Sequence, residues 1–355
     1  MKPLVLLSTV KGMIFIISDL QCSTKFTIRA MNPNEANDVV GLIYDCYGDS
    51  YFYKQYYNPE VIIHLNQSGY LKSVVAVTDT NEIIGHGALI KTTTDPQIVE
   101  PVMAFVKPAF RKQRVLTQIA EHLYIHRKPE LYQGVIGVYI PPVTKHTISQ
   151  KEVYCHGFKD CGIWLGYLPD AEFKEINSEY MQRITLVLTF LFVVQPKPMI
   201  IYPPKQHTDM IVNLLKNIGV PSVECRIPQK SSGIDGKSKL NIKEDKILNQ
   251  ATIKVIQYGQ NTFSEISTKL GELCLQKYTV IHLYLDLHNP LTYYLTPEFE
   301  KLGFFFAGIM PGTSCNDALI LQYLNNNPID FNRILLLSDT AKKILAYIVK
   351  NNPKL

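Results

Sequence analysis

The sequence has 355 residues, of which 46% are hydrophobic and 19% are charged, and its formal net charge is +5. A chain of this length has room for about two domains with cores of their own, and this composition excludes an intrinsically disordered protein. The net charge is small and the lysines and arginines are dispersed, which argues against a nucleic-acid-binding protein.

The N-terminal twenty residues are apolar, but Lys11 and Gly12 interrupt the run and no small-residue cleavage site follows. An extra strand or a loosely held extension is predicted there. The apolar run 184–194 is too short for a membrane helix and rich in Val, Thr and Phe, so it predicts a buried strand and no membrane partner. Seven cysteines without a Cys-x-x-Cys motif or zinc-ligand spacing predict reduced thiols, no metal and a cytoplasmic protein.

The first helix is predicted to begin after Asn32, because Asn32 can cap it, Pro33 suits its first position and Glu35 completes a capping box. After a second short helix, the runs "LKSVVAVTD" and "IIGHGALIKT" predict a β-hairpin. The run "VEPVMAFVKP" predicts the next strand, which leads through a basic loop into another helix.

The chain then continues with a strand at "GVIGVYIPPV", a short helix ending at Gly157 and two closing strands. Prolines cluster in residues 195–206, where a domain boundary is predicted. The second half is predicted to open with a helix at "HTDMIVNLLKNIG". Residues 228–246 are polar and predict an exposed loop, and a strand, a helix, a strand, a short helix and two strands follow.

The basic loop places three cations, Arg111, Lys112 and Arg114, within four residues between a strand and a helix. A helix N-terminus already carries partial positive charge, so bases placed there oppose the helix dipole. This arrangement indicates an anionic ligand.

The two halves share a short internal echo. "GFKDCGI" begins at Gly157 and "GFFFAGI" begins at Gly303, and each is predicted to follow a short helix and to precede a strand. The echo predicts that one ancestral unit was duplicated.

The segment "VKPAFRKQRVLTQIAEHL" resembles the Pro-x-Tyr-Arg-Gly-x-Gly loop and helix of the GNAT family of acetyl-CoA-dependent N-acetyltransferases. The stretches "SQKEVYCHGFKDCGIWLGYLP", "IYPPK" and "LGFFFAGIMPG" look like a subgroup of long proteins with a second, degenerate GNAT-like half. The resemblance implies an α/β fold with a mixed sheet and two tandem GNAT-like domains, at residues 24–195 and 196–355.

In this family the loop amides cradle the pyrophosphate of acetyl-CoA, and the preceding strand splays from its neighbour and offers its backbone to the pantetheine arm. The chain departs from the family at Lys112 and Arg114, where the family has glycine. These two side chains either lie outward and grip the phosphates or close the site. The cofactor-binding residues that the resemblance implies are Phe105, Val106, Arg111, Lys112, Gln113, Arg114, Val115 and Leu116.

Direct acetyl transfer to an amine requires a base for the amine and an acid for the departing thiolate. Glu100 lies eight residues before Pro108, where the family commonly has its base, although a solvated strand-end carboxylate is the alternative. Tyr154 is the candidate acid, although the family's tyrosine usually takes the position of Val153 and Tyr154 could instead serve packing.

The resemblance therefore implies an N-acetyltransferase that moves an acetyl group from acetyl-CoA to an amine, without a metal. The acceptor is open between a small amine, a protein N-terminus, a lysine and an antibiotic. The alternative is a non-catalytic GNAT-like binding or regulatory module, because the loop glycines are missing. In the second half, the corresponding helix opens with "TFSEI", which lacks glycines and bases and predicts no cofactor.

Overall fold

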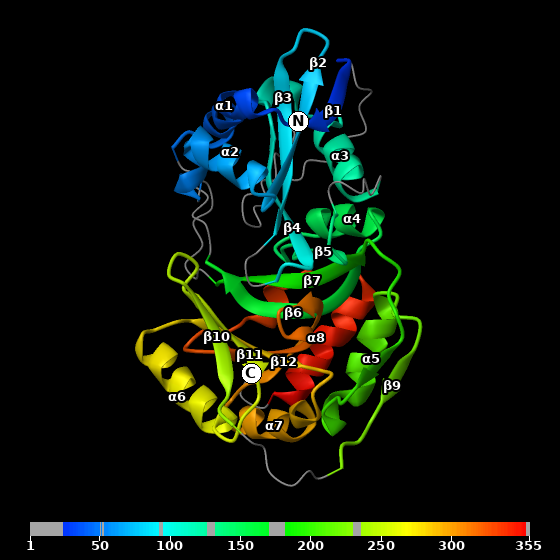
Figure 1. Ribbon diagram of the computed structural model, residues 1–355, viewed down its shortest axis with the longest axis vertical. Helices are drawn as coiled ribbons and strands as arrows, with labels where there is room; N and C mark the ends of the chain where they lie inside the picture. The colour runs from blue at the N-terminus through cyan, green and yellow to red at the C-terminus, as the bar shows by residue number, and fades with distance from the viewer. Residues whose placement is uncertain are drawn as a thin grey trace. The chain divides into compact units, whose positions relative to one another are not determined.

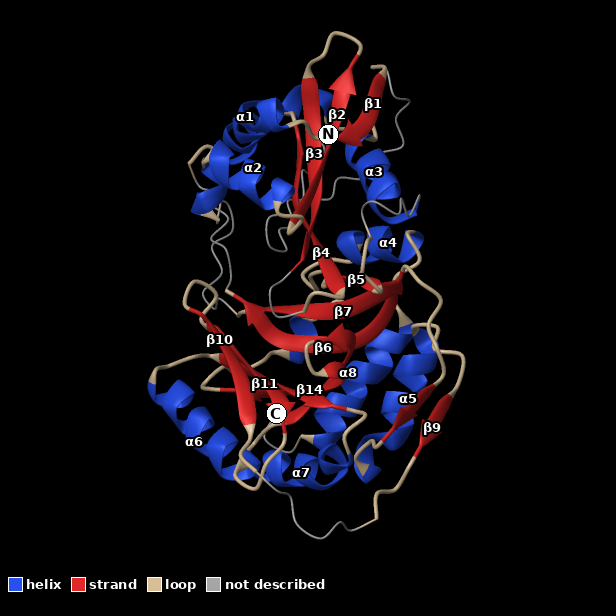
Figure 2. Ribbon diagram, viewed as in Figure 1, coloured by secondary structure: helices blue, strands red, loops and turns tan. Residues whose placement is uncertain are grey.

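The computed structural model describes residues 24–352 except 50, 52, 92–94, 126–131, 170–181 and 230–235. The predicted N-terminal strand or extension lies outside these residues. The protein has a mixed α/β fold (Figures 1 and 2). Contacts divide the chain into two compact units, a first unit of Met1–Ile140 with Lys151–Gly157 and a second unit of Pro141–Gln150 with Phe158–Leu355.

The strands of the first unit follow the order β1-β2-β3-β4-β5, with antiparallel neighbours except for the parallel pair β4 and β5. Figure 1 shows α1 and α2 beside one face of these strands and α3 beside the other. The predicted capping box is present, since the Asn32 amide donates to Glu35 Oε2 at 2.7 Å. The elements are β1 (Phe26–Ala30), η1 (Pro33–Glu35), α1 (Ala36–Tyr47), η2 (Lys54–Tyr57), α2 (Pro59–Gln67), β2 (Leu71–Thr78), β3 (Ile83–Lys91), β4 (Ile98–Val106), η3 (Pro108–Phe110), α3 (Val115–Ala120), η4 (Glu121–Ile125) and β5 (Gly137–Ile140), followed by α4 (Ile148–Cys155) at the division between units.

The strands of the second unit follow the order β7-β6-β13-β14-β12-β11-β10, and β8 and β9 form a separate parallel pair. Helices α5 and α8 pack against β6 and β13, and α6 packs against α7 (Figure 2). The elements are β6 (Lys159–Leu168), β7 (Ile184–Phe192), β8 (Met199–Ile201), η6 (Lys205–His207), α5 (Thr208–Asn217), β9 (Val223–Cys225), β10 (Lys239–Asp245), β11 (Gln250–Gln257), α6 (Thr262–Leu275), β12 (Val280–Asp286), α7 (Pro290–Lys301), β13 (Phe305–Thr313), β14 (Asn316–Leu324), η7 (Phe331–Arg333) and α8 (Asp339–Asn351).

Two predictions about single segments have different outcomes. The apolar run from Ile184 is strand β7, as predicted, and no helix in the described parts of the chain is long and apolar enough to cross a membrane. The loop predicted at 228–246 is wrong from Lys239 onward, where β10 pairs antiparallel with β11. β10 ends the strand order and none of its residues is fully buried. Its only apolar residues are Leu240 and Ile242, which form too short an alternation to identify a strand in a sequence.

The same order of elements occurs twice along the chain. The first series of elements is β3, β4, α3, β5, α4, β6 and β7. The second series, later in the chain, is β10, β11, α6, β12, α7, β13 and β14. The pairs β3–β4 and β10–β11 are antiparallel, β4–β5 and β11–β12 are parallel, and β6–β7 and β13–β14 are antiparallel. Gly157 and Gly303 each lie between a helix and a strand, as the echo predicts. We propose on this basis that residues 24–195 and 196–355 are the two copies of a duplicated unit.

The second glycine of each copy, Gly162 in β6 and Gly308 in β13, pairs with the other copy's glycine where the two strands meet. A Cβ atom on Gly162 would lie 2.5 Å from the Ala307 carbonyl oxygen, and one on Gly308 would clash with the Gly162 Cα. Gly308 also has a φ of +142°, which side-chain-bearing residues rarely adopt. The two backbones can therefore approach this closely only because both positions are glycine.

Gly308→Ala is expected to lower the free energy of unfolding by about 3 kcal/mol or more, because a backbone clash and a strained φ must both be relieved. Gly271→Ala is the matched control, since Gly271 lies in α6 with no atom within 4 Å of an added Cβ. Alanine there should stabilise the helix by about 0.5–1 kcal/mol. Urea unfolding would measure both changes, and equal stability of the two variants would contradict the close approach.

Two histidines are buried without charge. His282 in β12 is 1% exposed, and its ring lies 5.1 Å from that of Trp164 and 5.6 Å from that of Tyr167. Burial lowers the pKa of His282 to about 3. Burial likewise lowers the pKa of His86 in β3 to about 4. Both rings are therefore neutral at pH 7.

Because both histidines are neutral in the folded protein, we expect them to make the free energy of unfolding fall as the pH falls. In the unfolded chain each of these histidines takes up a proton near pH 6.5, whereas in the folded chain it does not. Each histidine therefore lowers the free energy of unfolding by about 2 kcal/mol between pH 7 and pH 5. His288 acts in the opposite sense, because its hydrogen bond to Asp317 raises its pKa. Comparing urea unfolding of the wild type and His282→Phe at both pH values isolates one contribution. An unchanged pH dependence in the variant would contradict this assignment.

Candidate functional site

β4 and β5 diverge within the first unit, as predicted. They pair in parallel at two positions, the last being Val99 with Val138, while β4 continues to Val106. Beyond Val99, the edge of β4 that faces β5 is therefore no longer occupied by that strand. An extended ligand could add to such an edge through main-chain hydrogen bonds.

The basic loop joins β4 to α3 and has a special backbone. Lys112 has a φ of 69° and Arg114 a φ of 59°, both in the left-handed region. For residues that carry a side chain this conformation costs roughly 1 kcal/mol each. These are the two positions at which the similar family has glycine. The loop thus adopts the left-handed backbone that glycine favours, although it contains none.

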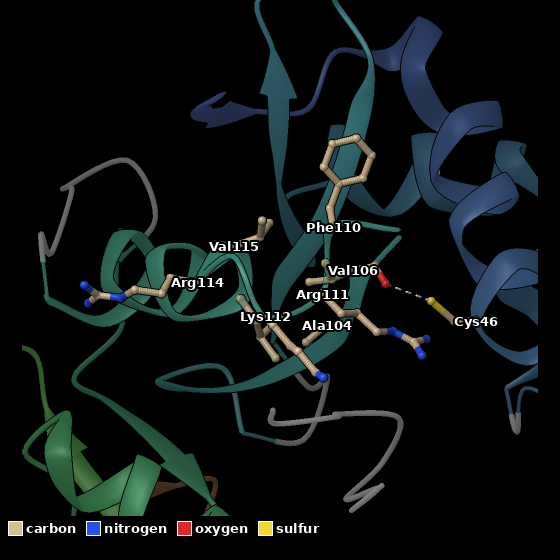
Figure 3. Close-up of a pocket in the computed structure, with 9 residues that line it drawn as sticks. Cys46, Ala104, Val106, Phe110, Arg111, Lys112, Arg114 and Val115 are labelled. Atoms are coloured by element: carbon tan, nitrogen blue, oxygen red, sulfur yellow. Dashed lines mark hydrogen bonds between the residues drawn. The ribbon is translucent and has the colours of Figure 1, made fainter. Parts of the chain in front are cut away.

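The loop borders a hollow of about 410 Å³, a volume that includes space open to solvent (Figure 3). All three predicted cations contribute to its wall. Phe105 and Gln113, also predicted to bind the cofactor, are absent from the lining. Sequence reasoning missed Cys46 and Phe110. The lining residues are Cys46, Ala104, Val106, Phe110, Arg111, Lys112, Arg114, Val115 and Leu116.

The three cations point in different directions around this hollow. In Figure 3 the side chain of Arg111 extends toward Cys46, whereas that of Arg114 extends the opposite way. Arg114 pairs with Glu121 at 3.7 Å, but both side chains are exposed, so this pair holds the arginine only weakly. Arg111 therefore lies on the Cys46 side of the hollow, whereas Arg114 extends away from that side.

Cys46 supplies the wall opposite the loop. Its thiol donates to the Val106 carbonyl oxygen at 3.4 Å. Burial raises the pKa of the Cys46 thiol, and the nearby Arg111 only partly opposes this effect. The thiol is therefore neutral at pH 7, and it adds no negative charge that would compete with an anionic ligand for Arg111.

A second hollow lies along the same strand, between β4 and α3, and its volume of about 230 Å³ likewise includes space open to solvent. It shares Ala104 and Leu116 with the first hollow and extends to Pro101, the residue after Glu100. The two hollows therefore follow one another along β4, from the basic loop toward the predicted base.

Glu100 is 3% exposed, so the alternative of a solvated carboxylate at a strand end is wrong. The Tyr139 hydroxyl donates to Glu100 Oε2 at 2.6 Å. Glu100 directly follows Val99, so it lies where β4 and β5 begin to part. Sequence reasoning missed Tyr139, because only the register of two parallel strands brings it beside Glu100.

Tyr154, the predicted acid, lies on α4 and is half-buried, and its carbonyl oxygen accepts the Gly157 amide at 3.0 Å. Neither Tyr154 nor Glu100 lines the two hollows, and Val153, at the family's usual tyrosine position, is buried. The roles of Glu100 and Tyr154 stay predictions. Within the described residues, no group of three or more His, Cys, Asp or Glu side chains could hold a metal.

The corresponding loop of the second half, between β11 and α6, is occupied by the chain itself. The Gln260 amide donates to the Gly236 carbonyl oxygen at 3.1 Å, and the Ser238 amide donates to Asn261 Oδ1 at 2.7 Å. The loop also contains no lysine or arginine between Gln257 and Thr262. An anion could bind there only by displacing Gly236–Ser238.

No family model and no curated protein matches the sequence. Similar solved structures include an acetyltransferase of the GNAT family from Streptococcus pneumoniae, with 12% identity, a TM-score of 0.37 and coverage of 47% of this chain and 99% of that chain. The protein yncA from Salmonella typhimurium, described with its cofactor acetyl-CoA, has 11% identity, a TM-score of 0.36 and coverage of 48% of this chain and 95% of that chain. The ribosomal-protein-S18-alanine N-acetyltransferase from Escherichia coli has 11% identity, a TM-score of 0.35 and coverage of 48% and 94%. Likenesses at these values assign no function to this chain.

Proposed function

We propose that the protein is an N-acetyltransferase whose first half binds acetyl-CoA at the basic loop. The observation that carries this proposal is the left-handed backbone at Lys112 and Arg114 in a loop whose three cations line an open hollow. Successive amides of such a turn form a concave anion site, and arginine and lysine add charge-assisted bonds to phosphate oxygens. A pyrophosphate group therefore fits the wall of the hollow that the basic loop forms.

The rest of the cofactor would follow β4. The edge that becomes available beyond Val99 suits the amide-bearing pantetheine arm, and the two hollows lead from the loop toward Pro101. The thioester, which supplies the activated acetyl group, would then lie in the part of the splay near Glu100. In this arrangement Glu100 takes the proton of the acceptor amine, directly or through water, and Tyr154 protonates the departing thiolate.

A second candidate function is that of a non-catalytic binding module. It is favoured by one observation, namely that Glu100 is buried, accepts a hydrogen bond from Tyr139 and lines neither hollow. Such a protein would bind CoA at the loop without a base that reaches an acceptor.

The test is turnover of acetyl-CoA with a panel of acceptors, comprising polyamines, aminoglycosides, peptides with free N-termini and peptides with lysine. Release of the CoA thiol and acetylated product, both dependent on an acceptor, would support the transferase. Binding of CoA without acceptor-dependent thiol release across the panel would favour the non-catalytic module.

A further inference from the structure

β4 contains a bulge beside the proposed cofactor site. Its register against β3 shifts between His86 and Ala88, so that β4 has one residue more than β3 over this interval. Met103, within the bulge, has a φ of 53° although it is fully buried. Bulges with a left-handed residue normally use glycine, so methionine needs a contact that holds it in this conformation.

His86 makes such a contact. It is fully buried, and its Nδ1 lies 2.7 Å from the Met103 carbonyl oxygen. Because the ring is neutral at pH 7 and a carbonyl oxygen only accepts, Nδ1 carries the hydrogen and donates it. The hydrogen bond ties the bulged peptide of β4 to the neighbouring strand β3.

The imidazole of His86 and the neighbouring Gly87 lie on opposite faces of β3, because side chains alternate along a strand. Gly87 is on the α3 face, where a Cβ atom at this position would lie 2.5 Å from Ile119 Cγ2. The His86 ring lies on the opposite face, stacked at 6.2 Å from the ring of Phe105. Ala104 and Val106, which follow the bulge, line the hollow at the basic loop.

We propose that His86 is a positioning residue, which holds the Met103 carbonyl and thereby fixes the bulge that sets the Ala104–Val106 backbone for acyl-CoA. The inference rests on the proposed function for the identity of the ligand. The fixing of the bulge itself does not depend on the ligand.

The test compares His86→Asn, which keeps a side-chain donor near Nδ1, with His86→Phe, which fills the space without one. Hydrogen exchange of the full chain is measured by amide, at a temperature at which all variants are folded. His86→Phe should accelerate exchange at Ala104–Val106 by about tenfold or more relative to the strands β1 and β2, whereas His86→Asn should restore most of the protection. His86→Leu provides a second variant without a donor if His86→Phe does not fold.

Calorimetry with CoA is the second arm of the test. The variants without a donor should bind CoA about tenfold more weakly, and His86→Asn should bind within about threefold of the wild type. If the wild type binds no CoA, the proposed function fails and the exchange data alone decide on the bulge. Unchanged exchange at Ala104–Val106 in His86→Phe and His86→Leu, or equal effects of the asparagine and phenylalanine variants, would overturn the positioning role.

Discussion

Replacing both Arg111 and Lys112 with glutamate is expected to weaken CoA binding by about 100-fold at low salt. Both side chains line the hollow, so the reversal removes two cations and adds two anions beside the proposed phosphate site. Titration calorimetry of the full chain measures the change. Lys25→Glu is the control, because Lys25 is an exposed cation of the same unit outside the hollow.

A separate variant distinguishes the side chain of Lys112 from its backbone. Lys112→Gly keeps the left-handed conformation without strain and should stabilise the fold by about 1 kcal/mol. If the side chain grips the phosphates, this variant should nevertheless bind CoA about tenfold more weakly. Binding that is as tight as in the wild type would show that the loop amides alone hold the ligand.

Glu100→Gln is expected to lower acetyl-CoA turnover with an amine acceptor by about 100-fold or more, while the affinity for CoA stays the same. Glutamine keeps the shape of the buried side chain and can still accept from Tyr139, so packing changes little. Tyr139→Phe should lower turnover less, by about tenfold, because it loosens the carboxylate without removing it.

The control for Glu100→Gln and Tyr139→Phe is Glu60→Gln, which removes an exposed carboxylate from α2 of the same unit. Initial rates of CoA thiol release, measured with acceptor at saturating acetyl-CoA, separate the variants. If Glu100→Gln and Glu60→Gln release thiol at equal rates, Glu100 is not the base.

Most of the secondary structure could be predicted because its local signals agree with the fold. The helix after Asn32 carries its own cap, and the strands β2, β3 and β4 are bounded by turn residues. β10 could not be found in this way, since Leu240 and Ile242 are its only apolar residues, and it is recognisable only by its pairing with β11. This segment is identified as a strand by its pairing with β11 and not by the pattern of its own residues.

The candidate site also has some features that the local sequence predicts and others that it does not. The cation cluster is contiguous in sequence, so its place between a strand and a helix followed from pattern alone. The left-handed φ of Lys112 and Met103 could not be predicted, because neither residue type favours it. The hydrogen bonds of Tyr139 with Glu100 and of His86 with Met103 join neighbouring strands, so they depend on register.

Titration calorimetry of CoA into the full wild-type chain measures whether the basic loop of the first half binds the cofactor. We expect one site per chain, because the second half's loop is occupied by Gly236–Ser238, and an affinity that falls as salt is raised from about 50 to about 500 mM. No heat of binding at millimolar CoA in low salt, or two equivalent sites per chain, would be incompatible with a single cofactor site at the basic loop.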